Sequence, residues 1–511
     1  MSRIARYTDA ASVLLPTLLI ALTAIISALR LPLWRDELAT MLFAKQDWSK
    51  LPVAVSHVDA VFGPYYAITR IAYLAIPTPF GLRLLPVGAA IATVLIITIL
   101  ARRWWGAVPA LVTGVALATN PLFQEMASTA RSYAIATFFV ALAVLLLDRA
   151  LRKGNLISWV GYGLAVAAAG YSHLFALLAV PAMIVYAIGV GRRRLLTVLF
   201  TTFVAGLIVM PVALAAYSQR GQVSWILRPT VRSGLGAFAS ALVNRSEGRF
   251  DALEAAVLLV TVVVLVAGIL LTLRMTPGAE RSLEFRRFGL AIVLAFAPWI
   301  ILFAVSLAST PFLRTNYLTP SLVGMALALG ATSARFRDLV ASTIHRRRFV
   351  TVATVIAVLA VIAVPAGRTA VEVTAPWRID DFPGLSTTIA RVVHVGDVMV
   401  FVQPPAETGV DAGSAEYLGD TKFFAQTVDR VTTGKQPILD VRVVTSTNPV
   451  TSISTSRVPP NATVWIVNTR GAYTVADGRA LEKRGITCAA PSRLTAVGAY
   501  GLMRLEQVNC R

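Results

Sequence analysis

Residues 31–43, LPLWRDELATMLF, follow the first long apolar run of the chain, residues 11–31, and decide how the sequence is interpreted. They place Arg35, Asp36 and Glu37 side by side in an apolar setting. An apolar run of this length can cross a membrane, so we expect the charged triplet at a membrane surface. Two adjacent carboxylates in that position must be held by neighbours or used in chemistry.

The composition is that of a polytopic membrane protein. Of the 511 residues, 56% are hydrophobic and 14% are charged, whereas soluble domains carry about 25% charged residues. Apolar runs of about 17 to 25 residues, enough to cross about 30 Å of hydrocarbon, recur along most of the chain. The first run is longer than the apolar core of a signal peptide and has no small-residue cleavage signal, so we expect it to remain as a span.

In a soluble protein, the net charge of +21 would suggest binding to nucleic acid. Short basic loops between spans explain it better, because cytoplasmic loops carry an excess of Lys and Arg. We therefore expect membrane lipids, and no nucleic acid, as partners. The basic loops are 102–103, 149–153, 192–194, 274–287 and 335–348.

These loops place the N-terminus in the cytoplasm and predict a polytopic α-helical protein with about eleven transmembrane helices. Residues 62–78 are predicted to be an interfacial helix, because counting them as a span would put Arg102 and Arg103 outside. An odd number of spans puts the C-terminus outside. The predicted spans are 11–31, 83–101, 107–122, 131–148, 156–171, 174–190, 194–216, 252–273, 288–307, 317–333 and 349–366.

Residues 367–511 change character and predict an extracytoplasmic α/β domain after a transmembrane domain of residues 1–366. Their helical and alternating apolar patterns follow one another, and about 145 residues can form a core of their own. Both cysteines, Cys488 and Cys510, fall there. One disulfide in an oxidising compartment and two free thiols are equally open.

Several polar side chains fall on the predicted outer loops or at the outer ends of the adjoining spans, although they were not used to set the topology. Each has a plain explanation: a helix cap for Asp36, a solvated loop for Asp59, an interfacial position for His173, and snorkelling for the arginines. Together they suggest acid–base chemistry beside aromatic rings, with arginine forks for an anionic ligand. They are Asp36, Glu37, Asp59, Tyr65, Tyr66, Arg131, Tyr133, His173, Arg314 and Tyr317.

Six motifs in this order resemble the bacterial family 39-like glycosyltransferases of the GT-C superfamily, relatives of protein O-mannosyltransferases and aminoarabinose transferases. The resemblance covers roughly residues 30–320. The motifs are LWRDELAT (33–40), DAVFGPYY (59–66), RLLPVGAA (83–90), ARSYAIATFF (130–139), YSHLFALL (171–178) and RTNYLTPS (314–321).

The resemblance implies a GT-C fold and transfer of a sugar from a polyprenyl-phosphate donor outside the bacterial cytoplasmic membrane, to a glycan, lipid or protein acceptor. The first acid of the DE pair, Asp36, matches the family's general base, and Asp59 matches its second acidic position. The chain departs from the family at residues 61–64, Val-Phe-Gly-Pro, where His-Pro-Pro-Leu is common, and at Ser132, where Pro is common.

The residues themselves fit this chemistry. A carboxylate activates an acceptor hydroxyl for attack on the anomeric carbon, with inversion of configuration. Arg131 or Arg314 would stabilise the leaving phosphate, and Glu37, the tyrosines and His173 would contact substrate. We expect neither a metal ion nor another cofactor, because the outer loops lack metal-ligand spacing. Mannose is the first expectation for the sugar.

Two alternatives from other classes stay open: a transporter or flippase for polyprenyl-linked sugars, and a non-catalytic envelope-assembly protein. Transporters tend to place ionisable groups at the bilayer midplane and often contain internal repeats. Here the spans are nearly free of charge, no repeat is detected, and the acids fall at the predicted outer surface, which favours glycosyl transfer.

Overall fold

The computed structural model describes residues 3–31, 33–223, 226–243, 252–275 and 278–341, eight residues between 366 and 392, and five strands between 398 and 509. The chain divides into two compact units. The first unit comprises residues 1–30 and 40–376, and the second comprises residues 31–39 and 377–511.

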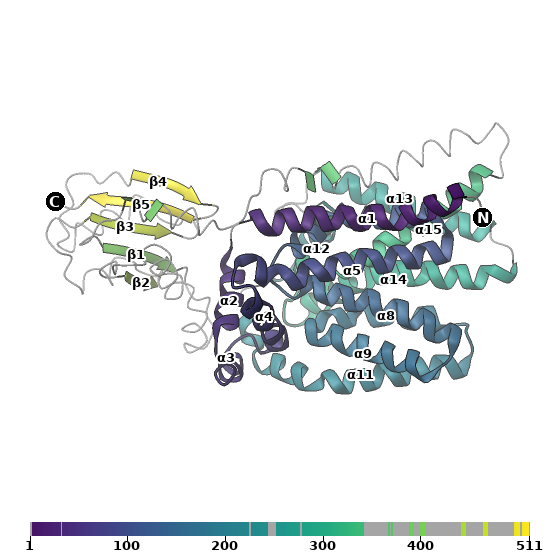
Figure 1. Cartoon of the computed structure of the whole chain (residues 1–511), viewed down its shortest axis with the longest axis horizontal. Coiled ribbons are helices and arrows are strands. Elements are labelled where there is room, and N and C mark those ends of the chain that lie inside the picture. The colour runs from purple at the N-terminus through teal and green to yellow at the C-terminus, as the bar shows by residue number, and fades with distance from the viewer. Residues whose placement is uncertain are drawn as a thin grey trace. The chain divides into compact units, whose positions relative to one another are not determined.

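The first unit is a bundle of long helices, with the short helices α3 and α4 at one end (Figure 1). The helices of the chain from the N-terminus are α1 (Arg3–Arg30), α2 (Arg35–Lys45), α3 (Leu51–His57), η1 (Ala60–Phe62), α4 (Gly63–Ala75), α5 (Pro79–Trp105), α6 (Ala107–Ala118), α7 (Pro121–Ala127), α8 (Tyr133–Lys153) and α9 (Leu156–Ser172). Of α2, residues 40–45 belong to the first unit and residues 35–39 to the second. They continue with η2 (Leu174–Ala179), α10 (Val180–Ala187), α11 (Arg192–Ser218), η3 (Arg220–Val223), α12 (Val231–Val243), α13 (Ala252–Met275), α14 (Gly278–Ala308), η4 (Thr315–Leu318) and α15 (Ser321–Ala341).

Six helices among the described residues are long and apolar enough to cross a membrane, which confirms a multi-pass membrane protein. They lie in α1, α5, α8, α11, α13 and α14. A seventh crossing is formed if α6 and α7, which meet at an angle of 65°, count as one broken span. The predicted total of about eleven stays a prediction, and its last segment, 349–366, lies outside the described residues.

Two parts of the predicted outer loops can be compared with the structure. The segment 62–78 contains α4, whose 13 residues are too few to cross the hydrocarbon layer, as an interfacial helix requires. The long loop expected at 217–251 contains the apolar helix α12, which the charge pattern did not indicate. Asn120 holds this helix: its side chain caps α7 and donates to the carbonyls of Ala241 and Leu242.

Short polar turns end the long helices where the sequence supplies cap residues. At the α8–α9 junction, Gly154 takes a left-handed conformation with φ of 68°, and the Asn155 side chain accepts from the Ser158 amide. Glycine ends a helix in this way without steric cost, and asparagine begins one. At the start of α5, Thr78 caps the helix in front of Pro79.

One side of α11 presents large apolar side chains outward. Phe200, Phe203 and Leu214 are each more than 60% exposed. An exposed apolar surface of this kind suits contact with lipid chains, because the hydrocarbon layer contains no water. The surface therefore agrees with the assignment of α11 as a span.

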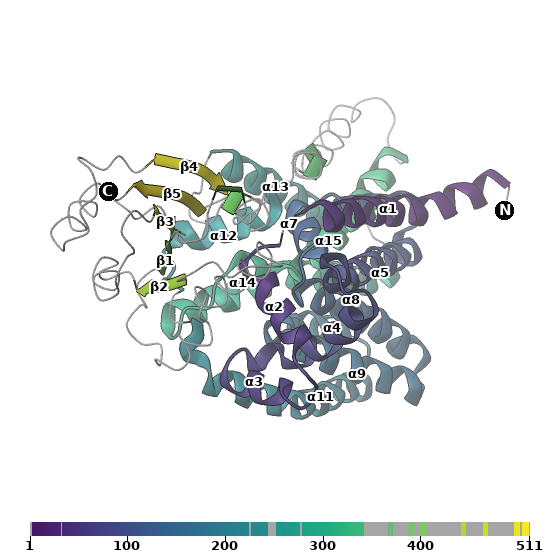
Figure 2. The ribbon, with the colours of Figure 1, turned by 60° about the vertical axis from the view of Figure 1, so that its left-hand side comes forward.

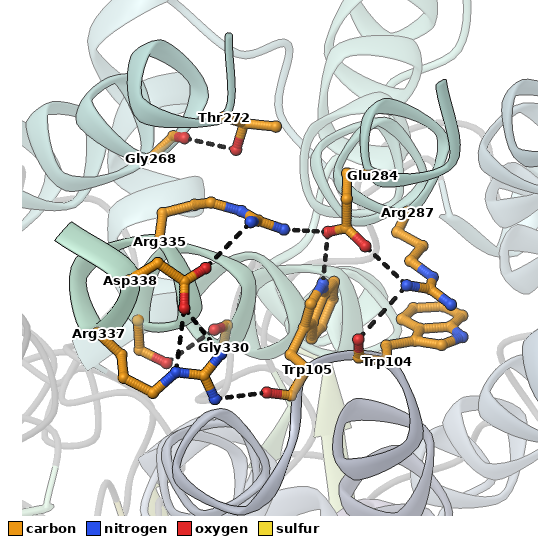
Figure 3. Close-up of polar contacts among 11 residues, drawn as sticks. Trp104, Trp105, Gly268, Thr272, Glu284, Arg287, Gly330, Arg335, Arg337 and Asp338 are labelled. Atoms are coloured by element: carbon orange, nitrogen blue, oxygen red, sulfur yellow. Dashed lines mark hydrogen bonds and ion pairs between the residues drawn. The ribbon is translucent and has the colours of Figure 1, made fainter. Parts of the chain in front are cut away.

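Ion pairs and indole hydrogen bonds join α5, α14 and α15 at the end of α5 that is remote from α4 (Figure 3). The buried carboxylate of Glu284 accepts from the Trp105 indole at 2.9 Å and from Arg287 at 2.7 Å, and it pairs with Arg335. Arg337 donates to the Trp105 carbonyl at 2.9 Å. Glu284 thus balances two arginines that have little contact with solvent.

We expect Glu284→Ala to lower the free energy of unfolding by about 3–5 kcal/mol, because it removes the carboxylate that Arg287 pairs with and leaves Arg335 with Asp338 alone among the ion pairs of the described residues. Thermal unfolding of the purified protein in detergent measures the change. Asp47→Ala is the control, since its pair with Lys50 is exposed on both sides, and it should leave the midpoint unchanged. Equal midpoints for the two variants would contradict the role of Glu284.

The described part of the second unit includes a five-stranded sheet in the order β2-β1-β3-β5-β4. Its strands are β1 (Val398–Gln403), β2 (Val441–Thr445), β3 (Thr463–Asn468), β4 (Thr495–Tyr500) and β5 (Met503–Asn509). β1 is parallel to β2 and β3, whereas β5 is antiparallel to β3 and β4. Cys488 and Cys510 lie outside the described residues, so the disulfide stays a prediction.

Candidate functional site

Asp59 begins the first part of the candidate site. It precedes η1 and has φ of 59° and ψ of 31°, the left-handed conformation. Among the described residues it is the one non-glycine residue with positive φ. This conformation is unfavourable for L-residues, although Asp tolerates it better than most, and such residues cluster at functional sites.

The Asp59 carboxylate is linked to Arg131 through Tyr66. The Tyr66 hydroxyl donates to Asp59 Oδ2 at 2.8 Å, and Arg131 Nη1 donates to the Tyr66 oxygen at 3.2 Å. The hydroxyl proton is therefore directed to the carboxylate, and the oxygen lone pair faces the guanidinium. A chain of this kind strengthens each bond and fixes the orientation of all three groups.

Aromatic rings pack against two members of the Asp59–Tyr66–Arg131 hydrogen-bond chain, Tyr66 and Arg131. The Phe43 ring stacks on Tyr66 with centroids 4.3 Å apart and planes at 9°. The Arg131 guanidinium lies 4.4 Å from the centroid of Phe62, a favourable cation–π distance. Phe62 belongs to the segment 61–64, where the sequence differs from the motif that it resembles, so this contact depends on a residue particular to this sequence.

A second group of rings surrounds His173, which follows the last residue of α9. Its imidazole centroid lies 5.2 Å from Tyr133, 5.0 Å from Tyr317 and 5.5 Å from Phe175. Phe62, at 6.0 Å, joins this group to the Arg131 contact. The structure thus brings Tyr133, His173 and Tyr317 together from three separate segments, next to the Asp59–Tyr66–Arg131 chain.

Burial, together with the positive charge of Arg131, lowers the pKa of His173 to about 3. The imidazole is therefore neutral at physiological pH. This state suits a side chain that packs among rings and argues against His173 as a general acid near pH 7.

We expect the pH dependence of activity between about pH 5 and 8 to show no imidazole inflection from His173, because its pKa lies below that range. His173→Phe should leave the shape of the pH–rate profile unchanged. Since the folded pKa is below the ordinary value of 6.5, the contribution of His173 to stability is complete above that pH and is lost as the pH falls toward 3. An inflection near pH 6 to 7 in the wild-type pH–rate profile that disappears in His173→Phe would contradict the low pKa of His173.

Tyr65 and Arg314 lie near the same groups. Tyr65 is buried in α4, and its ring centroid is 5.9 Å from that of Tyr66. Arg314 precedes η4 and is half-buried, three residues before Tyr317, and its carbonyl accepts from the Tyr317 amide at 3.1 Å. Contact of Arg314 with a phosphate group stays a prediction.

Asp36 and Glu37 belong to the second unit. Both lie in the first turn of α2, which begins at Arg35, so Asp36 lies inside the helix and not before it as an N-cap. A carboxylate in the first turn interacts favourably with the helix dipole. Glu37 is fully buried, whereas Asp36 is half-buried.

Two glutamines that the sequence did not indicate as site residues, Gln219 and Gln222, bond to the backbone around Asp59. They follow α11 with a spacing of three residues, as two polar side chains at the outer end of a predicted span. That spacing was the available signal, but nothing in the sequence connected them to a residue about 160 positions earlier. Among the described residues, no group of three or more His, Cys, Asp or Glu side chains could hold a metal ion.

Residues 59–217 match the family model described as dolichyl-phosphate-mannose-protein mannosyltransferase. The matched segment is about a third of the chain and contains four of the six motifs, including Asp59, Tyr66, Arg131 and His173. The resemblance to glycosyltransferases that the ordered motifs indicated is therefore confirmed. No curated protein sequence matches this chain.

Solved structures with a similar course of the chain include ArnT from Cupriavidus metallidurans in the apo state, which is 13% identical, with 98% of each chain covered and a TM-score of 0.40. The structure of the same protein bound to undecaprenyl phosphate gives the same identity and TM-score, with 98% of this chain and 97% of that chain covered. Arabinofuranosyltransferase AftD from Mycobacteria is 14% identical, with 88% of this chain and 35% of AftD covered and a TM-score of 0.41.

Proposed function

We propose that the chain, whose residues 59–217 match a mannosyltransferase family, is an inverting glycosyltransferase of the bacterial cytoplasmic membrane. It moves a sugar from a polyprenyl-phosphate donor to a glycan, lipid or protein acceptor on the outer face. The observation that carries the proposal is the Asp59–Tyr66–Arg131 chain beside the aromatic group around His173. A fixed cation next to rings is suited to a phosphate that carries a sugar.

In the proposed reaction, the acceptor hydroxyl attacks the anomeric carbon as its proton passes to the Asp36 carboxylate. A bond forms between the acceptor oxygen and the anomeric carbon, and the bond between that carbon and the phosphate oxygen breaks. A carboxylate in this role contributes about 10² to 10⁴-fold to the rate. The leaving polyprenyl phosphate takes the electron pair, and its charge is stabilised by Arg131 and Arg314.

Asp59 has a different proposed role from Asp36. It accepts from Tyr66, which accepts from Arg131, so its negative charge orients the guanidinium through one hydroxyl. An oriented guanidinium presents its planar donors to phosphate oxygens in a fixed direction. Asp59 thus prepares the phosphate site before the donor arrives.

The remaining candidate residues are proposed to contact the substrate. Tyr133, His173 and Tyr317 are proposed to contact the sugar, with Tyr65 and Glu37 as further substrate contacts. Mannose is the proposed sugar because the matching family is described by it. Residues 1–366 are proposed to form the transmembrane catalytic domain, with a cytoplasmic N-terminus, and residues 367–511 an outer domain.

The test is transfer by the purified protein in lipid vesicles with synthetic polyprenyl-phosphate sugars. Mannose, arabinofuranose, galactose and glucose donors are offered separately with extracted envelope glycans, lipids and proteins, and mass spectrometry measures released polyprenyl phosphate and modified acceptor. We expect one donor to be consumed with inversion at its anomeric carbon. Movement of a labelled donor across the vesicle membrane without consumption of any donor would instead favour the transporter.

A further inference from the structure

The turn between α3 and η1 needs hydrogen-bond partners from elsewhere in the chain. α3 ends at His57 and η1 begins at Ala60, so the carbonyls of one helix end and the amides of the next helix start face the same short turn. Helix ends leave such groups without partners of their own. Asp59, in its left-handed conformation, lies between them.

Gln219 supplies partners to both sides of this turn. Its Oε1 accepts from the Ala60 amide at 2.8 Å, and its Nε2 donates to the carbonyls of Val55 at 3.2 Å and Ser56 at 3.0 Å. Gln219 follows the last residue of α11, whose C-terminal end lies near α3 in both views (Figures 1 and 2).

Gln222, on η3, bonds in the same way nearer the middle of the turn, to His57 and Asp59. Its Oε1 accepts from the Asp59 amide at 3.2 Å, and its Nε2 donates to the His57 carbonyl over a longer distance of 3.5 Å. Each glutamine therefore accepts from the start of η1 and donates to the end of α3. An amide side chain does both at its two terminal atoms, whereas a carboxylate cannot donate and an ammonium cannot accept.

We infer that Gln219 and Gln222 are positioning residues for Asp59 in the proposed transfer reaction, on which this inference rests. Their five hydrogen bonds hold the backbone of Asp59 in a conformation that it would otherwise leave. A change of φ and ψ at Asp59 would swing its carboxylate away from the Tyr66 hydroxyl and so release Arg131. The first turn after α11, just beyond the matched segment 59–217, thus sets the geometry of the phosphate site.

The first test is the double variant Gln219→Leu/Gln222→Leu, which keeps side-chain volume and removes all five hydrogen bonds. We expect kcat to fall by about 10²-fold, the loss expected when a catalytic group is misplaced by about 1 Å. Tyr171→Phe is the matched control: it removes a hydrogen bond of 2.9 Å from α9 to the Ile208 carbonyl of α11, without touching the Asp59 turn, and should keep normal kcat. Normal kcat in the double variant would overturn the inference.

The second test separates positioning from a general loss of stability. If the glutamines act through Asp59, the two Leu substitutions should reduce kcat no further in an Asp59→Ala background. Full additivity of the two losses would overturn the inference.

A third measurement does not require activity. Hydrogen exchange of a peptide spanning residues 55–66 should be about tenfold faster in the double variant, because the Asp59 and Ala60 amides lose their acceptors. Unchanged exchange would overturn the inference even if the wild-type protein transfers no sugar. Absence of transfer with every donor, together with the expected faster exchange, would overturn the proposed function and leave the role of the glutamines in holding the turn supported.

Discussion

Asp36→Asn is expected to reduce turnover by about 10² to 10⁴-fold while leaving the fold and donor binding intact, because the amide cannot take the acceptor's proton. Asp36 is the first acid after the first span and lies in the first turn of α2. The substitution keeps the shape of the side chain and changes only its charge and proton affinity. The measurement is the single-turnover rate of sugar transfer by purified protein at saturating donor.

Two controls make the Asp36 result specific. Asp47→Asn changes an exposed carboxylate shortly after the same helix, which pairs with Lys50, and should keep wild-type turnover. Binding of a polyprenyl phosphate to the Asp36→Asn protein should equal that of the wild type. Near-normal transfer by a folded Asp36→Asn protein would remove the assignment of Asp36 as base.

Hydropathy and charge predicted the helices of the first unit well, because the bilayer imposes one rule along the whole chain: apolar runs must be helical and long. The segment 83–101 lies within α5, and 194–216 lies within α11. The same rule could not reveal α12, since its 13 residues are apolar but too short to span. Tertiary contacts, such as the Asn120 bonds to Ala241 and Leu242, help to hold it.

The candidate site could be predicted only in part. The predicted membrane topology suggested that Asp59, Arg131, His173 and Tyr317 would lie at one surface, because it placed the loops and span ends that carry them on the outer side. The hydrogen bond from Tyr66 to Asp59 spans seven residues, but the one from Arg131 to Tyr66 spans 65. Contacts at such separations depend on helix packing, which periodicity does not specify.

The left-handed backbone at Asp59 was also beyond prediction from the sequence. Glycine or asparagine usually marks this conformation, whereas Asp59 stands in an ordinary Val-Asp-Ala context. The glutamines that stabilise it lie about 160 residues away. The local sequence therefore indicated neither the left-handed backbone of Asp59 nor the hydrogen bonds that stabilise it. Both depend on the packing of α11 beside the turn.

Arg131→Ala is expected to weaken binding of a polyprenyl phosphate by about 10 to 100-fold, the equivalent of about 1.5–3 kcal/mol for hydrogen bonds to a charged group. Arg131 is buried, fixed by Tyr66 at 3.2 Å, and lies over the Phe62 ring. Arg131→Lys should weaken binding less, since it keeps the charge and loses the planar fork. Native mass spectrometry of purified protein with a polyprenyl phosphate measures both.

Tyr66→Phe decides whether Arg131 acts on the donor or only through Asp59. It removes the hydroxyl that joins Asp59 to Arg131 and keeps the ring that stacks on Phe43. If Arg131 binds phosphate directly, Tyr66→Phe misorients the guanidinium but leaves its charge in place, so affinity should fall less than in Arg131→Ala. If the two variants weaken binding equally, the guanidinium serves only to hold Tyr66 and Asp59. Unchanged affinity in Arg131→Ala and Arg131→Lys alike would mean that Arg131 has no part in the donor site, and Arg314 would then be the remaining candidate for the phosphate.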